Sequence, residues 1–184
     1  MTTVAAVVDN EPSGRLVRRI VSDWGFEVYD GRERSTAIMM ACGALSESMP
    51  TVLLLDSDTL EDRLLRERQH LVEIILNRCR GRIPYRLILA VPQIEAILFS
   101  ERKGFERALG RKVADLDWFE ARFRPRAVFR RLLGEGDFEE KALAVINALD
   151  EAALRRMARH PIIREIRDFM AEVQPKRARV RRVG

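Results

Sequence analysis

The chain has 184 residues, of which 47% are hydrophobic and 33% charged, and its formal net charge is +5. This length suits one α/β domain with a helical addition, and the apolar fraction is sufficient to bury a core. No apolar run approaches the roughly 18 residues of a membrane-spanning helix, so we expect no membrane partner.

The positive charge is concentrated at the C-terminal end. Residues 174–184 contain no acid, whereas residues 1–173 are close to neutral. A basic cluster attracts the phosphate backbone of DNA or RNA, and it is also typical of a disordered, solubilising tail. The candidate nucleic-acid-binding residues of this tail are Lys176, Arg177, Arg179, Arg181 and Arg182.

Cysteine usage and the N-terminus predict a cytoplasmic protein. Cys42 and Cys79 fall in two expected helices and have neither metal-ligand nor disulfide spacing. Isolated thiols suit a reducing compartment, and residues 1–10 lack the basic leader of a signal peptide. We interpret His70 and His160 as solvated helix residues.

Strands and helices are expected to alternate over the first 92 residues. Short apolar runs bounded by turn residues predict strands over 3–9, 26–29, 51–56 and 85–91. Helical spacing predicts helices over 15–24, 34–48 and 60–80. This order predicts an α/β fold with a mainly parallel, four-stranded, Rossmann-like sheet flanked by helices.

The second half of the chain is expected to be helical. In the 60–80 helix, the residues predicted to face the sheet are Leu64, Leu65, Leu71, Val72, Ile75 and Leu76. After Pro92 no strand pattern returns, and glycines and prolines separate segments with helical spacing. These segments cover residues 93–100, 103–109, 115–122, 125–134, 137–149, 150–159 and 161–173, and we expect them to pack on the sheet.

Acidic residues follow three of the expected strands. They are Asp9 and Glu11 after the first, Asp56 and Asp58 after the third, and Glu95 after the fourth. Ligands of open α/β sheets bind beyond the carboxyl ends of the strands, and gathered carboxylates repel each other unless a cation compensates them. Each acid also suits a turn or the first turn of a helix, where the helix dipole favours negative charge.

These acids carry a resemblance to a known family. An acid closing the first strand and the run VLLLDSD over residues 52–58 resemble the Toprim (topoisomerase–primase) domain. Residues 90–100, AVPQIEAILFS, resemble the P-x-x-E segment of Toprim-like OLD-type nucleases and of their small stand-alone prokaryotic relatives. Residues 158–170 resemble the closing helix of those relatives. The resemblance implies a Toprim-like core over 1–100, a helical extension over 101–173 and a basic tail over 174–184.

The resemblance also implies a chemistry. Asp56 and Asp58 would be ligands of Mg²⁺ or Mn²⁺, Glu95 would be a third acid near the metal, and Asp9 or Glu11 would be the first catalytic acid. The implied activity is that of a metal-dependent nuclease that acts in phage or mobile-element defence. The family's first acid is a glutamate followed by glycine, and this chain has Asp9-Asn10-Glu11 instead.

Two other interpretations stay open. The chain could be a catalytically degenerate Toprim-like module that binds nucleic acid or a partner ATPase, since it has no Walker-type Gly-x-x-x-x-Gly-Lys of its own. It could also be a receiver-like signalling domain with Asp56 as phosphoacceptor, although the lysine expected after a later strand is missing.

Residues 117–131 interleave aromatic residues with arginines. Such a stretch could stack on and clamp single-stranded nucleic acid. The apolar positions also form a helical stripe typical of a buried face, with the arginines reaching outward. We favour core packing for this stretch, through Val128, Phe129, Leu132 and Leu133.

Overall fold

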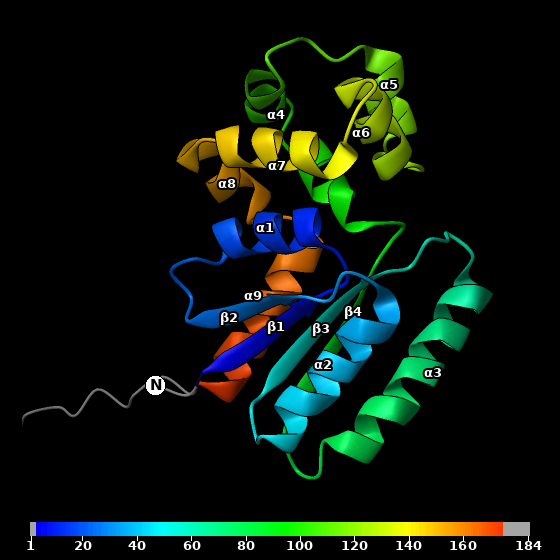
Figure 1. The fold of residues 1–184 in the computed structure, drawn as a ribbon, viewed down its shortest axis with the longest axis vertical. Coiled ribbons are helices and arrows are strands. Elements are labelled where there is room, and N and C mark those ends of the chain that lie inside the picture. The colour runs from blue at the N-terminus through cyan, green and yellow to red at the C-terminus, as the bar shows by residue number, and fades with distance from the viewer. Residues whose placement is uncertain (1–2, 175–184) are drawn as a thin grey trace, which may run out of the picture.

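The computed structural model describes residues 3–174, and the basic tail lies outside the described residues. Within them, β1 (Val4–Val8), β2 (Phe26–Asp30), β3 (Thr51–Asp56) and β4 (Tyr85–Ala90) form one sheet. All neighbouring strands are parallel, and their order is β2-β1-β3-β4 (Figure 1). The expected parallel four-stranded α/β fold is therefore confirmed.

Helices connect and extend these strands. In the first half they are α1 (Glu11–Ile20), α2 (Arg34–Ser46) and α3 (Asp62–Cys79). After β4 follow a 3₁₀ helix, η1 (Ile94–Ser100), and then α4 (Arg102–Leu109), α5 (Asp115–Glu120), α6 (Pro125–Leu133), α7 (Phe138–Ala148), α8 (Glu151–Met157) and α9 (Pro161–Val173). The helical C-terminal half predicted from the sequence is present.

Local sequence explains how α1 begins and where it packs. The Asn10 side chain accepts a hydrogen bond from the Ser13 backbone N–H (2.9 Å), so it caps the free donors of the first turn. Gly14 follows in that turn, and a Cβ at this position would overlap with the Asp30 carboxylate. The glycine therefore lets α1 lie close to the end of β2.

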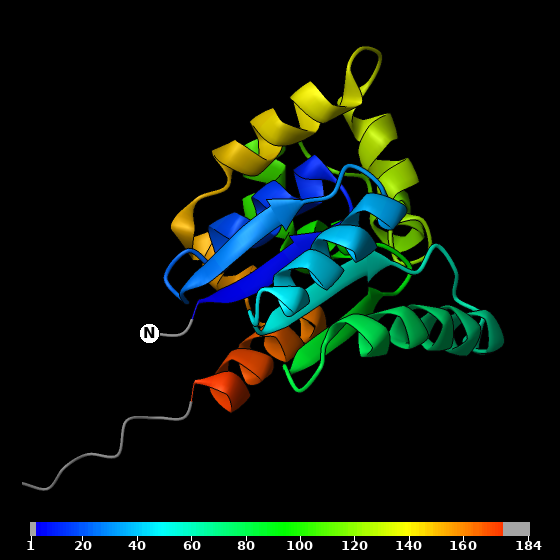
Figure 2. The ribbon, with the colours of Figure 1, turned by 60° about the horizontal axis from the view of Figure 1, so that its bottom comes forward.

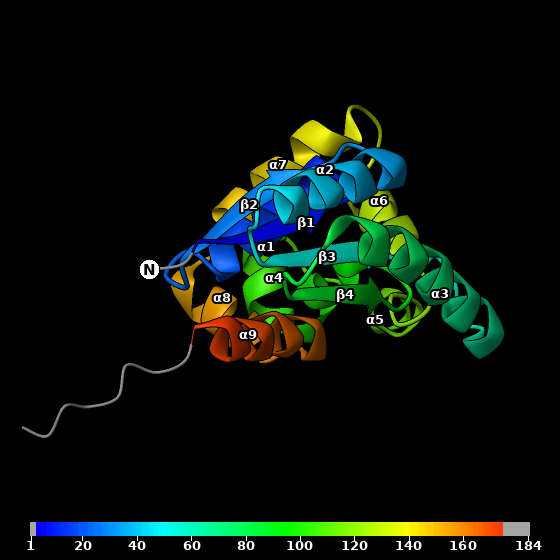
Figure 3. The same cartoon turned by 90° about the horizontal axis from the view of Figure 1, so that it is seen from below.

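The two faces of the sheet are covered by different helices. One cluster of buried residues joins Val7, Leu53 and Leu55 of the sheet to α2 and α3. The other joins Val8 and Leu54 to α1 and to the C-terminal helices. Figure 2 shows this layering, and Figure 3 shows α9 beside β4. Because β1 and β3 are buried on both faces, they read in the sequence as continuous apolar runs.

The predicted inward face of α3 is only partly correct. Val72 and Leu76 are buried, but Leu64, Leu71 and Ile75 are exposed. Helix α3 covers the β4 side of the sheet, next to α2, and Figure 3 shows it at the outer edge of the molecule. A helix at the edge of a sheet buries only a narrow strip, so an apolar stripe remains uncovered on α3.

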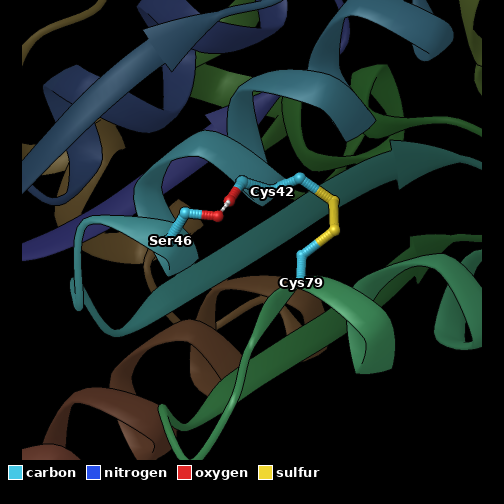
Figure 4. The surroundings of a disulfide bond; sticks show 3 residues. All are labelled: Cys42, Ser46 and Cys79. Carbon is cyan, nitrogen blue, oxygen red and sulfur yellow. Dashed lines mark hydrogen bonds between the residues drawn. A yellow bond between two sulfur atoms is a disulfide. The ribbon is translucent and has the colours of Figure 1, made fainter.

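The two cysteines form a disulfide, which corrects the prediction of isolated thiols. Cys42 of α2 and Cys79 at the end of α3 have Cα atoms 5.3 Å apart and a sequence separation of 37 (Figure 4). The Ser46 hydroxyl donates to the Cys42 carbonyl (2.9 Å) on the same helix. Sequence spacing gave no hint of the bond because the two helices become neighbours only when both cover the same face of the sheet.

None of the helices within residues 3–174 combines the length and the apolar character needed to cross a membrane.

Candidate acidic site at the carboxyl edge of the sheet

Asp9 and Asp56 lie side by side at the carboxyl ends of β1 and β3, which are adjacent parallel strands. Both residues are buried, and Asp56 is only 2% exposed. Asp9 Oδ2 accepts a hydrogen bond from the Asp56 backbone N–H (3.0 Å), and its Oδ1 accepts one from the Asn10 side chain (3.0 Å). The strand-end geometry therefore brings together two of the predicted acids.

Glu95 completes a group of three buried carboxylates, which we call the acid cluster (Asp9, Asp56 and Glu95). It lies in η1, next to Ile94, whose backbone N–H donates to Asp56 Oδ1 (2.7 Å). Glu95 is 4% exposed. The turn from β4 through Pro92 thus places a third carboxylate at the same edge of the sheet, as the sequence predicts.

Arg126, the second residue of α6, bridges the acid cluster. Its Nε donates to Glu95 Oε1 (2.7 Å), and its Nη2 donates to Asp56 Oδ2 and to Glu95 Oε2 (3.3 Å). Its backbone N–H also donates to the side chain of Gln93 (3.2 Å). A guanidinium suits such a position, since its planar set of donors matches carboxylate oxygens in pairs.

The electrostatics of this cluster are unbalanced, because three buried carboxylates share Arg126, and Arg34 adds only a smaller positive contribution at Asp9. Burial, together with the charges of Glu95 and Asp9, raises the pKa of Asp56 to about 7. Burial also raises the pKa of Asp9. For Arg126, burial alone would lower the pKa, but the Glu95 and Asp56 carboxylates raise it overall. The cluster therefore favours binding of a further positive charge or a proton.

Asp58 and Glu11 lie apart from this cluster. Asp58 adopts a left-handed backbone conformation (φ 50°), which Asp tolerates better than most residues, and its side chain is exposed. It accepts hydrogen bonds from Arg34 and Gln93, both at 2.9 Å. Glu11 is exposed at the start of α1. Of the two candidates for the first acid, Asp9 is the one beside Asp56.

The present arrangement does not fit Mg²⁺. Within residues 3–174, no group of three or more His, Cys, Asp or Glu side chains is placed to hold a metal ion. The oxygen donors are of the right kind, but both carboxylate oxygens of Asp56 already accept hydrogen bonds, from Ile94 and Arg126. Arg126 occupies the position between Asp56 and Glu95 where a cation would be expected.

A second feature lies just before Arg126 in the chain. We call Phe119, Arg122, Phe123 and Arg124 the aromatic–arginine surface. The two phenylalanines are 57% and 50% exposed, and their ring centroids lie 5.6 Å apart. Arg122 and Arg124 are exposed and form no ion pair within residues 3–174. The expected core packing is confirmed for Val128, Phe129 and Leu132, but Phe119 and Phe123 of the same stretch face solvent.

Two features of the sites were missed by the sequence analysis. In the sequence Arg126 is one of several arginines expected to reach outward, and Pro125 is a local signal for the start of α6. His160 was predicted to be solvated, yet it is half-buried before α9, and its Nδ1 has no hydrogen-bond partner in the described part of the chain. Burial lowers the pKa of His160.

No protein-family model matches the chain, and no curated protein or solved structure matches it either. The likeness to Toprim-like proteins therefore depends only on the sequence segments quoted above.

Proposed function

We propose that this protein is a catalytically degenerate Toprim-like module that binds single-stranded nucleic acid. The aromatic–arginine surface carries the proposal. Exposed rings next to exposed arginines are suited to stacking on bases while the cations neutralise phosphates. In the chain this surface immediately precedes Arg126. Arg126 is hydrogen-bonded to Asp56 at the edge of the sheet where α/β proteins bind their ligands.

Arg126 supports the non-catalytic form of this module. In a metal-dependent enzyme the carboxylates need free oxygens for the ion. Here the guanidinium fixes Asp56 and Glu95 to each other and attaches α6 to the sheet. We infer that the acid cluster, through Arg126, holds the C-terminal helices in place and thereby positions the aromatic–arginine surface.

Binding of a labelled single-stranded oligonucleotide of about 20 nucleotides, followed by fluorescence anisotropy, tests the proposal. Replacing both Phe119 and Phe123 by Ala is expected to weaken binding roughly tenfold or more, because stacking on each base is lost. Met39→Ala, an exposed residue of α2, is the matched control and should bind as the wild type does.

The basic tail needs its own variant in the same assay. Neutralising Lys176, Arg177, Arg179, Arg181 and Arg182 should reduce the salt dependence of binding and leave the effect of the two phenylalanines intact. If the double Phe→Ala variant binds as well as the wild type, the aromatic–arginine surface is not the binding site.

Metal-dependent phosphodiester chemistry is the second candidate. One observation favours it: the acid cluster carries more negative charge than Arg126 compensates, and the pKa of Asp56 is raised to about 7. The wild type and Asp56→Ala are to be incubated with single- and double-stranded DNA and RNA in Mg²⁺ or Mn²⁺. Cleavage that Asp56→Ala abolishes, or a rise in melting temperature with Mg²⁺ that needs Asp56, would favour the nuclease over the binding module.

A receiver-like function is supported less well. The strand order suits it, since flavodoxin-like folds share the order 2-1-3-4. A phosphoacceptor, however, needs a carboxylate oxygen that a phosphoryl donor can reach. Asp56 is 2% exposed, and both of its carboxylate oxygens are hydrogen-bonded. Action in phage defence and a partner ATPase stay predictions of the resemblance alone.

A further inference from the structure

A small apolar cavity lies between α2, α3 and the ends of β3 and β4, on the face of the sheet opposite the C-terminal helices. Its volume is about 200 Å³. An engineered cavity of about 150 Å³ holds benzene, so this one has room for a ligand of roughly eight non-hydrogen atoms. The apolar lining residues are Ile38, Leu55, Leu71, Val72, Ile75 and Leu89.

One cation of the lining, Arg68, has a buried side-chain nitrogen without a hydrogen-bond partner in the described part of the chain. Arg34, Asp56 and Arg68 form the polar part of the lining. Arg34 already donates to the Asp56 carbonyl (2.8 Å) and to Asp58 (2.9 Å). Arg68 differs, because its Nη1 is enclosed and has no hydrogen-bond partner within residues 3–174. An enclosed donor of a charged group without an acceptor is costly.

The charge of Asp56 does not exclude an anion from this cavity. Asp56 Oδ1 accepts from the Ile94 backbone N–H and Oδ2 accepts from Arg126, so its charge is partly compensated from the other side. The cavity therefore combines an apolar interior with a guanidinium whose Nη1 has no acceptor among the described residues. Arginine pairs with carboxylates through two parallel hydrogen bonds.

We propose that this cavity binds a small carboxylic acid in its ionised form, with an apolar body of about five carbon atoms. The carboxylate accepts hydrogen bonds from Arg68, and the hydrocarbon lies against Leu55, Val72 and Leu89. Leu71 and Ile75, which are 57% and 43% exposed, close over it at the mouth. This site is separate from the aromatic–arginine surface, so it stands whether or not the protein binds nucleic acid.

Calorimetric titration of the full chain with hexanoate and, separately, with 1-hexanol tests the proposal. Both probes fit the apolar cavity, but only hexanoate can pair with Arg68. Hexanoate is expected to bind roughly tenfold or more tightly than hexanol, since a charge-assisted hydrogen bond is lost with the alcohol. Arg68→Gln should weaken hexanoate binding by a similar factor, while Arg66→Gln, an exposed arginine of the same helix, should leave it unchanged.

A variant that fills the cavity provides a second, independent readout. Ile75→Phe adds volume at the mouth and should abolish binding of both probes, with circular dichroism showing that the fold persists. The proposal is wrong if hexanoate does not bind the wild type, if it binds no better than hexanol, or if Arg68→Gln binds it as the wild type does. It is also wrong if sedimentation shows a dimer that Leu71→Ser on α3 abolishes and that hexanoate leaves intact.

Discussion

Asp56 is the residue on which the electrostatics of the sheet edge depend. It lies between two other carboxylates, and its direct ionic partner is Arg126. Removing charged groups from water is costly, and Arg126, with a smaller contribution from Arg34, offsets only part of that cost for three acids. A proton on Asp56 relieves the imbalance at the pH where most proteins function, as its pKa of about 7 indicates.

The contribution of Asp56 to the stability of the protein should therefore fall as pH rises from about 4 to 7. The pKa of Asp56 is about 7 in the folded state and about 3.8 without the fold, so the folded state binds the proton more tightly. Its contribution to the free energy of unfolding is then full below pH 4, is lost between about pH 4 and 7, and stays constant above that. The slope is at most about 1.4 kcal/mol per pH unit.

Urea unfolding at pH values from 4 to 8 measures this contribution. Asp56→Asn removes the titrating group. The unfolding free energy of the variant minus that of the wild type should therefore become more positive as pH rises. Asp23→Asn, at an exposed position, is the control and should keep the wild-type profile. A constant difference between the wild type and Asp56→Asn across this range would contradict a raised pKa.

The acids of this edge were predictable from the sequence, whereas their partner was not. Asp9, Asp56 and Glu95 each follow a strand, and parallel strands bring such residues to one edge whatever the rest of the fold does. Arg126 follows Glu95 by 31 residues, and its contact depends on how α6 packs against η1. Helical spacing identifies the inner face of a helix but not its neighbour.

At the scale of elements, α2 and α3 form a pair that the disulfide holds together. They cover the same face of the sheet, with the apolar cavity between them. Disulfides persist mainly in oxidising compartments, so the Cys42–Cys79 bond removes one of the two grounds for expecting a cytoplasmic protein. The cytoplasmic location stays a prediction.

Reducing this bond should destabilise the protein. The separation of 37 residues corresponds to about 3–4 kcal/mol of unfolding free energy when the loss of chain entropy in the unfolded state is considered alone. Chemical unfolding with and without dithiothreitol measures the difference. Cys79→Ser should have the stability of the reduced wild type under both conditions and should not respond to the reductant. An equal stability of the reduced and oxidised wild type would contradict the prediction.

At the scale of the whole molecule, the helical half and the sheet share one core. Val8 and Leu54 of the sheet belong to the same buried cluster as Phe129 and Phe169 of the C-terminal helices. Polar contacts cross the same boundary: Arg19 of α1 donates to the Leu149 carbonyl (2.8 Å) and also to the Ile146 carbonyl at the end of α7. Separating the two halves would expose this cluster to water.

The two halves should therefore unfold together, in a single transition. Trp24 lies just before β2 and Trp118 lies in α5, and both pack against the shared cluster. Trp24→Phe and Trp118→Phe each leave one fluorophore, which reports on one half of the chain. Denaturant curves of the two variants, normalised for their stabilities, should coincide with each other and with the loss of helical circular dichroism. A fluorescence transition of Trp118 at lower denaturant concentration than that of Trp24 would mean that residues 101–173 form an independent unit. Arg19→Gln should lower the midpoints of both transitions if the halves unfold together, and should leave the Trp24 midpoint unchanged if they do not.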